Sequence, residues 1–188
     1  MEETDLYSRQ FAEAGQRVGA DVFAAETLSQ AIEYIANKSQ GITLVPPTPL
    51  AARHDLSQLL QDAGVEVYAG DFRQAGQMPA AGVTFCNFAM ADTGTVVLES
   101  TAEDMRLATT LPEIHFVIVD PQKVLSDNLA ATEPLKALHA GSAPCFVAYI
   151  SGPSRTADIE RVLTIGCHGP RELHILLVPS VSSDLMEI

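Results

Sequence analysis

The sequence predicts an α/β fold of three layers, in which a mainly parallel sheet has helices on both of its faces. Two observations lead to this class. Short apolar runs alternate with amphipathic segments along the chain, and short connections join them. The apolar runs also lack the strict polar alternation of a half-exposed strand, which is typical of strands buried on both faces in a parallel sheet. We expect a single domain that spans residues 1–188.

The first half of the chain shows helix and strand patterns in turn. We expect a helix over 7–20, a strand over 21–23, a helix from Thr27 to Gly41, a strand over 42–45, a helix over 55–63 and a strand over 65–68. Thr27 and Gln30 form a capping-box pattern, which places a helix start there. Two prolines after residue 45 stop the strand before them, because proline has no N–H to donate.

The second half continues with buried strands around one long helical pattern. We expect strands over 83–86, 95–98 and 114–119, a helix over 121–139, and strands over 145–150 and 173–178. Pro134 predicts a kink or a break in the long helix. The stretch 70–81 is rich in alanine and glycine, and we interpret it as a loop inside the single domain.

Composition excludes several classes of function. The net charge of −13 gives no basic footprint for nucleic acid, and no lysine-rich stretch suggests an anionic membrane. The acidic N-terminus lacks a signal-peptide pattern, and no apolar run approaches the ~20 residues that span a bilayer. Three widely spaced cysteines without a CxxC pair indicate reduced thiols in the cytoplasm and no cluster or zinc site. No P-loop or GxGxxG motif follows a strand, so we expect no bound cofactor.

The segment 151–160, SGPSRTADIE, carries the strongest signal for a binding site. It follows an apolar run and leads through hydroxyls, a glycine and a proline into an expected helix start at Ser154. The free N–H groups of a helix start attract an anion, and Arg155 adds planar donors that suit a carboxylate. Alternatively, Ser154 is an ordinary N-cap, with Asp158 as a first-turn acid.

A second loop has the same chemistry. Residues 91–95, ADTGT, stand directly before an expected strand. Two polar turns that contain glycine at strand ends are what a ligand crevice in an open α/β sheet requires. In so acidic a chain, an anion site also depends on local arginines, and the candidates are Arg106, Arg155, Arg161 and Arg171.

Glu99 and His168 are the candidate catalytic residues. A glutamate at a strand end can act as a nucleophile toward thioesters, although it can also be a solvated terminus or an ion-pair partner for Arg106. His168 suits hydrogen bonding or acid–base chemistry. A metal site would need His168, His174, Asp158 or Glu160 to converge, because the histidine spacing is not one of a known zinc motif. His115, inside an apolar strand, is by default a core histidine with its hydrogen bonds satisfied.

Four blocks of the chain together resemble the lactate utilization protein C family, which carries the LUD domain. The blocks are ADTGTVVLES at 91–100, RL and LP at 106–112, SGPSRTADIE at 151–160 and GCHGPRELH at 166–174. The resemblance covers residues 82 to 178 well and the first 80 only in general layout. It implies a three-layer fold similar to the NagB/RpiA/CoA transferase-like group. It also implies a cytoplasmic role in oxidising L-lactate to pyruvate, beside partner proteins that carry iron–sulfur clusters.

These observations predict a non-redox component of a lactate-oxidising system that binds a small anionic metabolite between the two loops. The residues that we expect to contact this ligand are Thr93, Gly94, Thr95, Arg106, Ser151, Gly152, Ser154, Arg155, Thr156, Asp158 and His168. The alternatives are a stand-alone enzyme of the CoA-transferase or 5-formyltetrahydrofolate cyclo-ligase type, for which Glu99 would have to face the crevice, and a pure scaffold.

Overall fold

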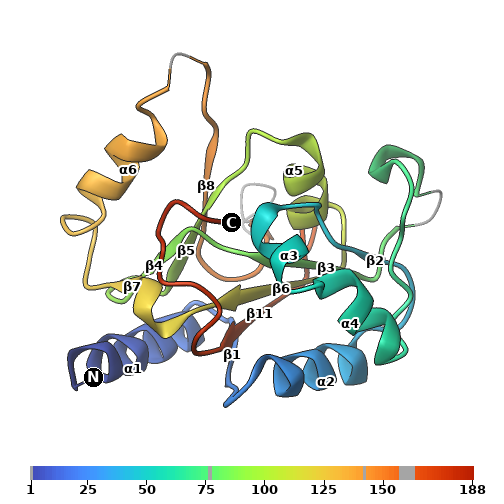
Figure 1. Ribbon diagram of the computed structural model, residues 1–188, viewed down its shortest axis with the longest axis horizontal. Coiled ribbons are helices and arrows are strands. Elements are labelled where there is room, and N and C mark those ends of the chain that lie inside the picture. Colours follow the sequence, from blue (N-terminus) through green and yellow to red (C-terminus); the bar gives the residue numbers. More distant parts are fainter. Residues whose placement is uncertain (1, 76–77, 142, 157–163) are drawn as a thin grey trace.

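A five-stranded parallel sheet forms the centre of the computed structural model, which describes residues 2–75, 78–141, 143–156 and 164–188 (Figure 1). The strand order is β1-β11-β6-β3-β2. These strands are β1 (Asp21–Ala24), β2 (Thr43–Leu44), β3 (Ala81–Phe85), β6 (Ile114–Val119) and β11 (Glu172–Leu177). Each neighbouring pair runs parallel. The predicted α/β class with a mainly parallel sheet is therefore confirmed.

Three helices cover one face of this sheet. They are α2 (Leu28–Lys38), α3 (Pro49–Arg53) and α4 (Leu56–Asp62). Their buried side chains, such as Ile35 and Leu60, pack against Phe116 and Leu176 of the sheet. Thr27 caps α2 as predicted, because its side chain accepts a hydrogen bond from the Gln30 N–H at 3.3 Å, whereas the Gln30 side chain accepts from the Glu26 N–H at 2.8 Å and not from Thr27.

The other face packs against α1 (Glu2–Arg17), α5 (Glu103–Thr110) and a second sheet that the sequence did not reveal. The second sheet has the order β7-β4-β5-β8. Its strands are β4 (Phe88–Met90), β5 (Thr95–Glu99), β7 (Val124–Leu125) and β8 (Val147–Ile150). β5 runs antiparallel to both of its neighbours. Val96 and Leu98 of β5 share a core with Phe11 of α1 and Val117 of β6.

Three expected elements differ in the structure. The expected helix over 121–139 is instead the 3-10 turn η2 (Pro121–Lys123), strand β7 and the short helix α6 (Thr132–Leu138). The expected strand over 65–68 is reduced to a single bridge between Thr43 and Val67. No helix begins at Ser154, because β9 (Arg155–Thr156) follows it and pairs with β10 (Thr164–Ile165).

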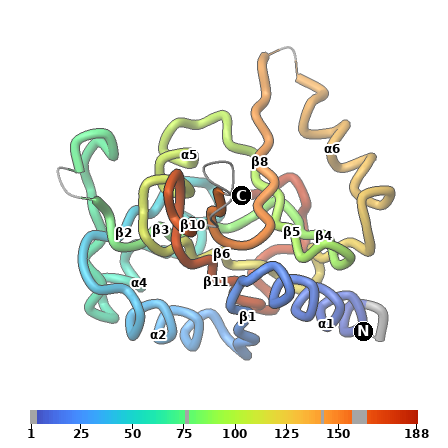
Figure 2. Tube along the Cα trace, turned by 180° about the vertical axis from the view of Figure 1, so that it is seen from behind, coloured from blue at the N-terminus to red at the C-terminus, as the bar shows by residue number. Residues whose placement is uncertain are grey.

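The remaining described elements lie at the periphery. The expected loop 70–81 contains the 3-10 turn η1 (Phe72–Gln74). Helix α6 and residues 143–146 before β8 stand away from the body of the molecule, as both views show (Figures 1 and 2). No helix in the described ranges is long and apolar enough to cross a membrane.

The C-terminal segment 179–188 lies over the carboxyl ends of the central strands. Buried Asp120, directly after β6, accepts hydrogen bonds from the N–H groups of Val181 and Ser182 at 2.8 and 3.1 Å. Lys123, which is 1% exposed, donates to the carbonyls of Glu187 at 2.7 Å and Cys86 at 3.3 Å. Open α/β sheets commonly bind ligands at this edge. In this chain the C-terminal segment fills that space.

Candidate ligand pocket

A pocket of about 240 Å³ lies at the opposite, amino ends of β6 and β11, on the side of the second sheet. Its walls come from the end of α5, from β8 and the turn that follows it, and from the turn before β11. Four of the predicted ligand-contacting residues line it: Ser151, Gly152, Ser154 and His168. The structure therefore brings together two segments, around 151–154 and 168–170, that the sequence separates.

The two polar loops predicted from the sequence do meet. Thr95 Oγ1 lies 2.7 Å from Ser151 Oγ and donates to Thr93 Oγ1 at 2.8 Å, so three hydroxyls form a connected chain. Only Ser151 of these three lines the pocket. The loop 93–95 thus supports the pocket wall from behind.

Gly94 and Gly152 allow both loops to approach the carboxyl end of α1. Both have positive φ angles, +65° and +79°, which residues other than glycine rarely adopt. A Cβ atom at Gly94 would lie 2.3 Å from the backbone nitrogen of Gly15, and one at Gly152 would lie 2.2 Å from the carbonyl oxygen of Val18. The two glycines therefore set the position of the pocket wall against the helix.

Two of the predicted arginines bind backbone carbonyls. Arg155 Nη2 donates to the Val18 carbonyl at 2.6 Å, where a positive charge also complements the carboxyl end of α1. Arg106 Nη1 donates to the carbonyls of Ser100 at 2.7 Å and Thr101 at 2.6 Å. Neither arginine lines the pocket. Their contact with a ligand stays a prediction, and the geometry gives each one a structural partner.

Glu99 lies at the end of β5 and is half-buried. Its Oε1 accepts a hydrogen bond from the Thr101 N–H at 2.7 Å, and the Cys145 thiol lies 3.9 Å from the same oxygen. The residue is absent from the described lining of the pocket. Its carboxylate thus closes the turn that follows β5.

His168 is exposed and lies on the rim of the pocket. It also lines a second, wider hollow of about 570 Å³ between the 166–169 turn and η1. Its Nε2 lies 3.7 Å from the Cys167 thiol. Among the described residues that line the 240 Å³ pocket, His168 and His115 are the only ones whose side chains could carry a positive charge, because none of the others is lysine or arginine. Thr156 lies in β9, whereas Asp158, Glu160 and Arg161 lie outside the described residues.

His115 lines this pocket, which its place in an apolar strand did not indicate. The residue is 1% exposed, lines the inner end of the pocket and has a 3.0 Å hydrogen bond between Nε2 and Thr84 Oγ1. Its Nδ1 is buried and has no hydrogen-bond partner in the part of the chain that the structure describes. Burial lowers the pKa of His115 to about 3, so the ring is neutral near pH 7. The expected core histidine is therefore satisfied at only one of its two nitrogens.

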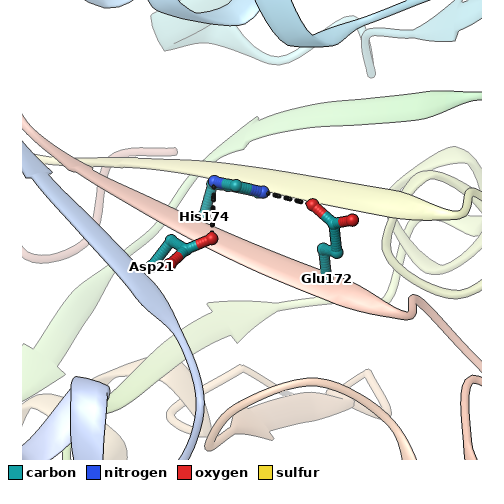
Figure 3. Close-up of side chains that lie close together, drawn as sticks. All are labelled: Asp21, Glu172 and His174. Carbon is teal, nitrogen blue, oxygen red and sulfur yellow. Dashed lines mark hydrogen bonds and ion pairs between the residues drawn. The ribbon is translucent and has the colours of Figure 1, made fainter.

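His174, another of the metal candidates, lies on the other face of the sheet between two carboxylates (Figure 3). Its Nε2 is 2.8 Å from Glu172 Oε2, and its Nδ1 is 2.9 Å from the Tyr34 hydroxyl and 3.6 Å from Asp21 Oδ2. One ligand atom from each of the three residues lies within 4.8 Å of the others, but both ring nitrogens of His174 already have hydrogen-bond partners. Burial and the two nearby carboxylates raise the pKa of Tyr34. The cluster fits a hydrogen-bonded ring better than a metal centre.

Residues 8–178 match the LUD domain family, and the chain belongs to this family. Among curated proteins, it is 30% identical to lactate utilization protein C of Geobacillus kaustophilus over 170 residues, which cover 82% of this chain and 70% of that protein. It is 28% identical to lactate utilization protein C of Bacillus subtilis over 158 residues, which cover 78% of this chain and 66% of that protein.

A third relative matches a shorter segment. An uncharacterized protein of Neisseria meningitidis is 40% identical over 98 residues, which cover 52% of this chain and 42% of that protein. The chain thus spans only part of the length of these relatives. Among solved structures, a DUF162 family protein from Deinococcus radiodurans superposes with a TM-score of 0.67 at 18% identity, over 93% of this chain and 98% of that one. That similarity supports the fold.

Proposed function

We propose that this protein is a non-redox component of a system that oxidises L-lactate to pyruvate, and that it binds a small 2-hydroxy or 2-oxo acid in the 240 Å³ pocket. The role rests on membership of the LUD domain family and on the name of its relatives, lactate utilization protein C. The pocket is the observation that gives the role a physical site. It gathers Ser151, Ser154 and His168 from the two turns around 151–154 and 168–170.

The chemistry of the lining supports a small polar acid. The Ser154 hydroxyl can donate to a carboxylate, and His168 at the rim can supply a positive charge when it is protonated. Leu173 and Ile150 provide the apolar wall that a methyl group would contact. This lining suits a molecule with a carboxylate at one end and a short hydrocarbon part.

The electrons that leave lactate would pass to partner proteins with iron–sulfur clusters. The three cysteines of this chain, Cys86, Cys145 and Cys167, are free thiols that lie in three separate loops. Free thiols are also typical of a reducing compartment, so we propose a cytoplasmic location. The protein on its own is then expected to be inert toward lactate, and turnover should appear only with its partners.

Thermal or urea unfolding with added ligand tests the proposal. The panel is L-lactate, pyruvate, phosphate, CoA and ATP, and a ligand at 100 times its Kd raises the free energy of unfolding by about 2.7 kcal/mol. L-Lactate and pyruvate should stabilise the protein, and His168→Ala should weaken the effect. His139→Ala serves as the matched control, because His139 is an exposed histidine directly after α6 that does not line the pocket.

Other outcomes would replace the proposal. Stabilisation by CoA or ATP alone would favour a stand-alone enzyme of the CoA-transferase or 5-formyltetrahydrofolate cyclo-ligase type, and Glu99→Gln would then be the next variant. Stabilisation by none of the panel would favour a pure scaffold. The Glu99 carboxylate, which already accepts the Thr101 N–H, gives the enzyme alternative no support from geometry.

A further inference from the structure

His115 lines the pocket, and its ring nitrogen Nδ1 has no hydrogen-bond partner in the described chain. The other ring nitrogen, Nε2, lies 3.0 Å from the Thr84 hydroxyl. Buried side-chain nitrogens nearly always have a partner, and those without one are often parts of a functional site. A partner that the chain does not supply is therefore expected in the pocket.

The ring is neutral, which limits what that partner can be. A neutral imidazole has one nitrogen that donates and one that accepts, and it carries no charge to attract a carboxylate. Its natural partners are an uncharged hydroxyl or carbonyl oxygen. The carboxylate of a small acid would then lie at the other end of the pocket, toward His168 and the hydroxyl of Ser154.

The Thr84 hydroxyl makes the ring able to switch roles. When Nε2 carries the proton, it donates to Thr84, and Nδ1 is free to accept from a ligand hydroxyl. When Nδ1 carries the proton, it donates to a ligand carbonyl, and the Thr84 hydroxyl turns to donate to Nε2. A hydroxyl donor and a carbonyl acceptor can therefore be bound by the same pair of residues without any change of charge.

We propose that His115 is the specificity-determining residue of the pocket, and that it recognises the oxygen on C2 of a small 2-hydroxy or 2-oxo acid, with Thr84 setting its tautomer. This inference rests on the proposed function, because it assumes that such an acid enters the pocket. The oxygen on C2 is the atom that distinguishes these acids from a simple carboxylic acid. The two tautomers of His115 explain how the hydroxy and oxo forms could both bind.

Calorimetric titration of the full chain with L-lactate, pyruvate and propionate tests the inference. Propionate has the same carbon number and carboxylate but no C2 oxygen. We expect L-lactate and pyruvate to bind with similar affinity and propionate about tenfold more weakly, since one hydrogen bond to a neutral buried group is worth about that factor. Equal affinity for all three acids would overturn the inference while leaving the pocket occupied by an acid. Binding of none of them would overturn the proposed function and the inference together.

A matched pair of variants separates the two ring nitrogens. The amide of His115→Gln can reach the position of Nε2 and keep the contact with Thr84, whereas the amide of His115→Asn can reach the position of Nδ1. The glutamine variant should bind L-lactate as weakly as propionate, and the asparagine variant should keep part of the preference. The reverse order would contradict the role of Nδ1.

Nitrogen-15 NMR of the histidine rings in the unmodified protein gives a readout that needs no variant. With L-lactate bound, His115 should be protonated at Nε2, and with pyruvate bound it should be protonated at Nδ1. A ring that keeps one tautomer with both acids would show that another molecule, such as water, pairs with Nδ1, and the inference would fail.

Discussion

The stability of the protein should fall steeply below pH 6.5 because His115 is buried as a neutral ring. Replacing it with glutamine removes the titrating group and keeps a polar atom toward Thr84. The wild-type protein and His115→Gln are therefore compared in urea unfolding between pH 8 and pH 5. The difference between their free energies of unfolding isolates the contribution of this one histidine from that of all other groups.

The sign and size follow from the two pKa values. In the unfolded chain the pKa of a histidine is about 6.5, whereas burial lowers that of His115 to about 3. Between these values the unfolded state binds more protons than the folded state, so stability is lost as the pH falls. At pH 5 the pKa of this histidine in the unfolded chain lies about 1.5 units above the solution pH. At about 1.36 kcal/mol per unit, the free energy of unfolding is therefore lower by about 2 kcal/mol.

The wild-type protein should therefore lose about 2 kcal/mol more stability than His115→Gln between pH 8 and pH 5. The difference between the two proteins should be constant from pH 7.5 upward, which serves as the internal control. Parallel curves for the two proteins across the whole range would refute the reasoning, because they would show that His115 takes up a proton in the folded state as readily as in the unfolded chain.

Three further substitutions test the packing around the pocket and the C-terminal segment. Gly152→Ala should lower the free energy of unfolding by more than about 2 kcal/mol, measured in urea, because φ is +79° and the new Cβ would lie 2.2 Å from the Val18 carbonyl oxygen. Arg155→Ala should lower stability by about 1 kcal/mol through its lost bond to Val18 while changing L-lactate affinity less than twofold in calorimetry. A large loss of affinity for L-lactate would instead show that Arg155 contacts the ligand. Lys123→Ala should cost about 2–4 kcal/mol in thermal unfolding, because it leaves a cavity and an unpaired Glu187 carbonyl; a cost below about 0.5 kcal/mol would mean that the C-terminal segment is not held there.

Hydrophobic patterning predicted the central sheet well and failed to predict the second one. The apolar run of β5 is as buried as those of β3 and β6, and burial on both faces does not show which sheet a strand joins. Pro134 was expected to kink or break a long helix. It instead lies in the first turn of α6, where the N–H it lacks would have no partner within the helix.

The segment 151–160 shows why a sequence motif can name a site without giving its geometry. Ser151, Gly152 and Ser154 do line a pocket. Arg155, however, belongs to β9 and reaches back to the end of α1, a partner 137 positions earlier that no local pattern can reveal. Such long-range pairing depends on tertiary packing, which places the 151–154 turn against the helix.

His115 could not have been identified from sequence for a similar reason. Its surroundings in the chain are those of an ordinary buried strand. Its importance comes from its unpartnered Nδ1 and from its place in the pocket wall, which depends on how β6, α5 and the turn before β11 meet. A histidine in an apolar strand was the available signal, and only the geometry separates a satisfied ring from one that still lacks a partner.

The most direct test of the account is amide NMR of the protein as L-lactate is added. We predict saturable shifts confined to the 151–154 turn, the 168–170 turn and the residues around His115, with propionate producing the same shifts only at higher concentration. Shifts centred on His174 and Glu172, or no shifts with L-lactate or pyruvate, would contradict the claim that this pocket binds a small 2-hydroxy or 2-oxo acid.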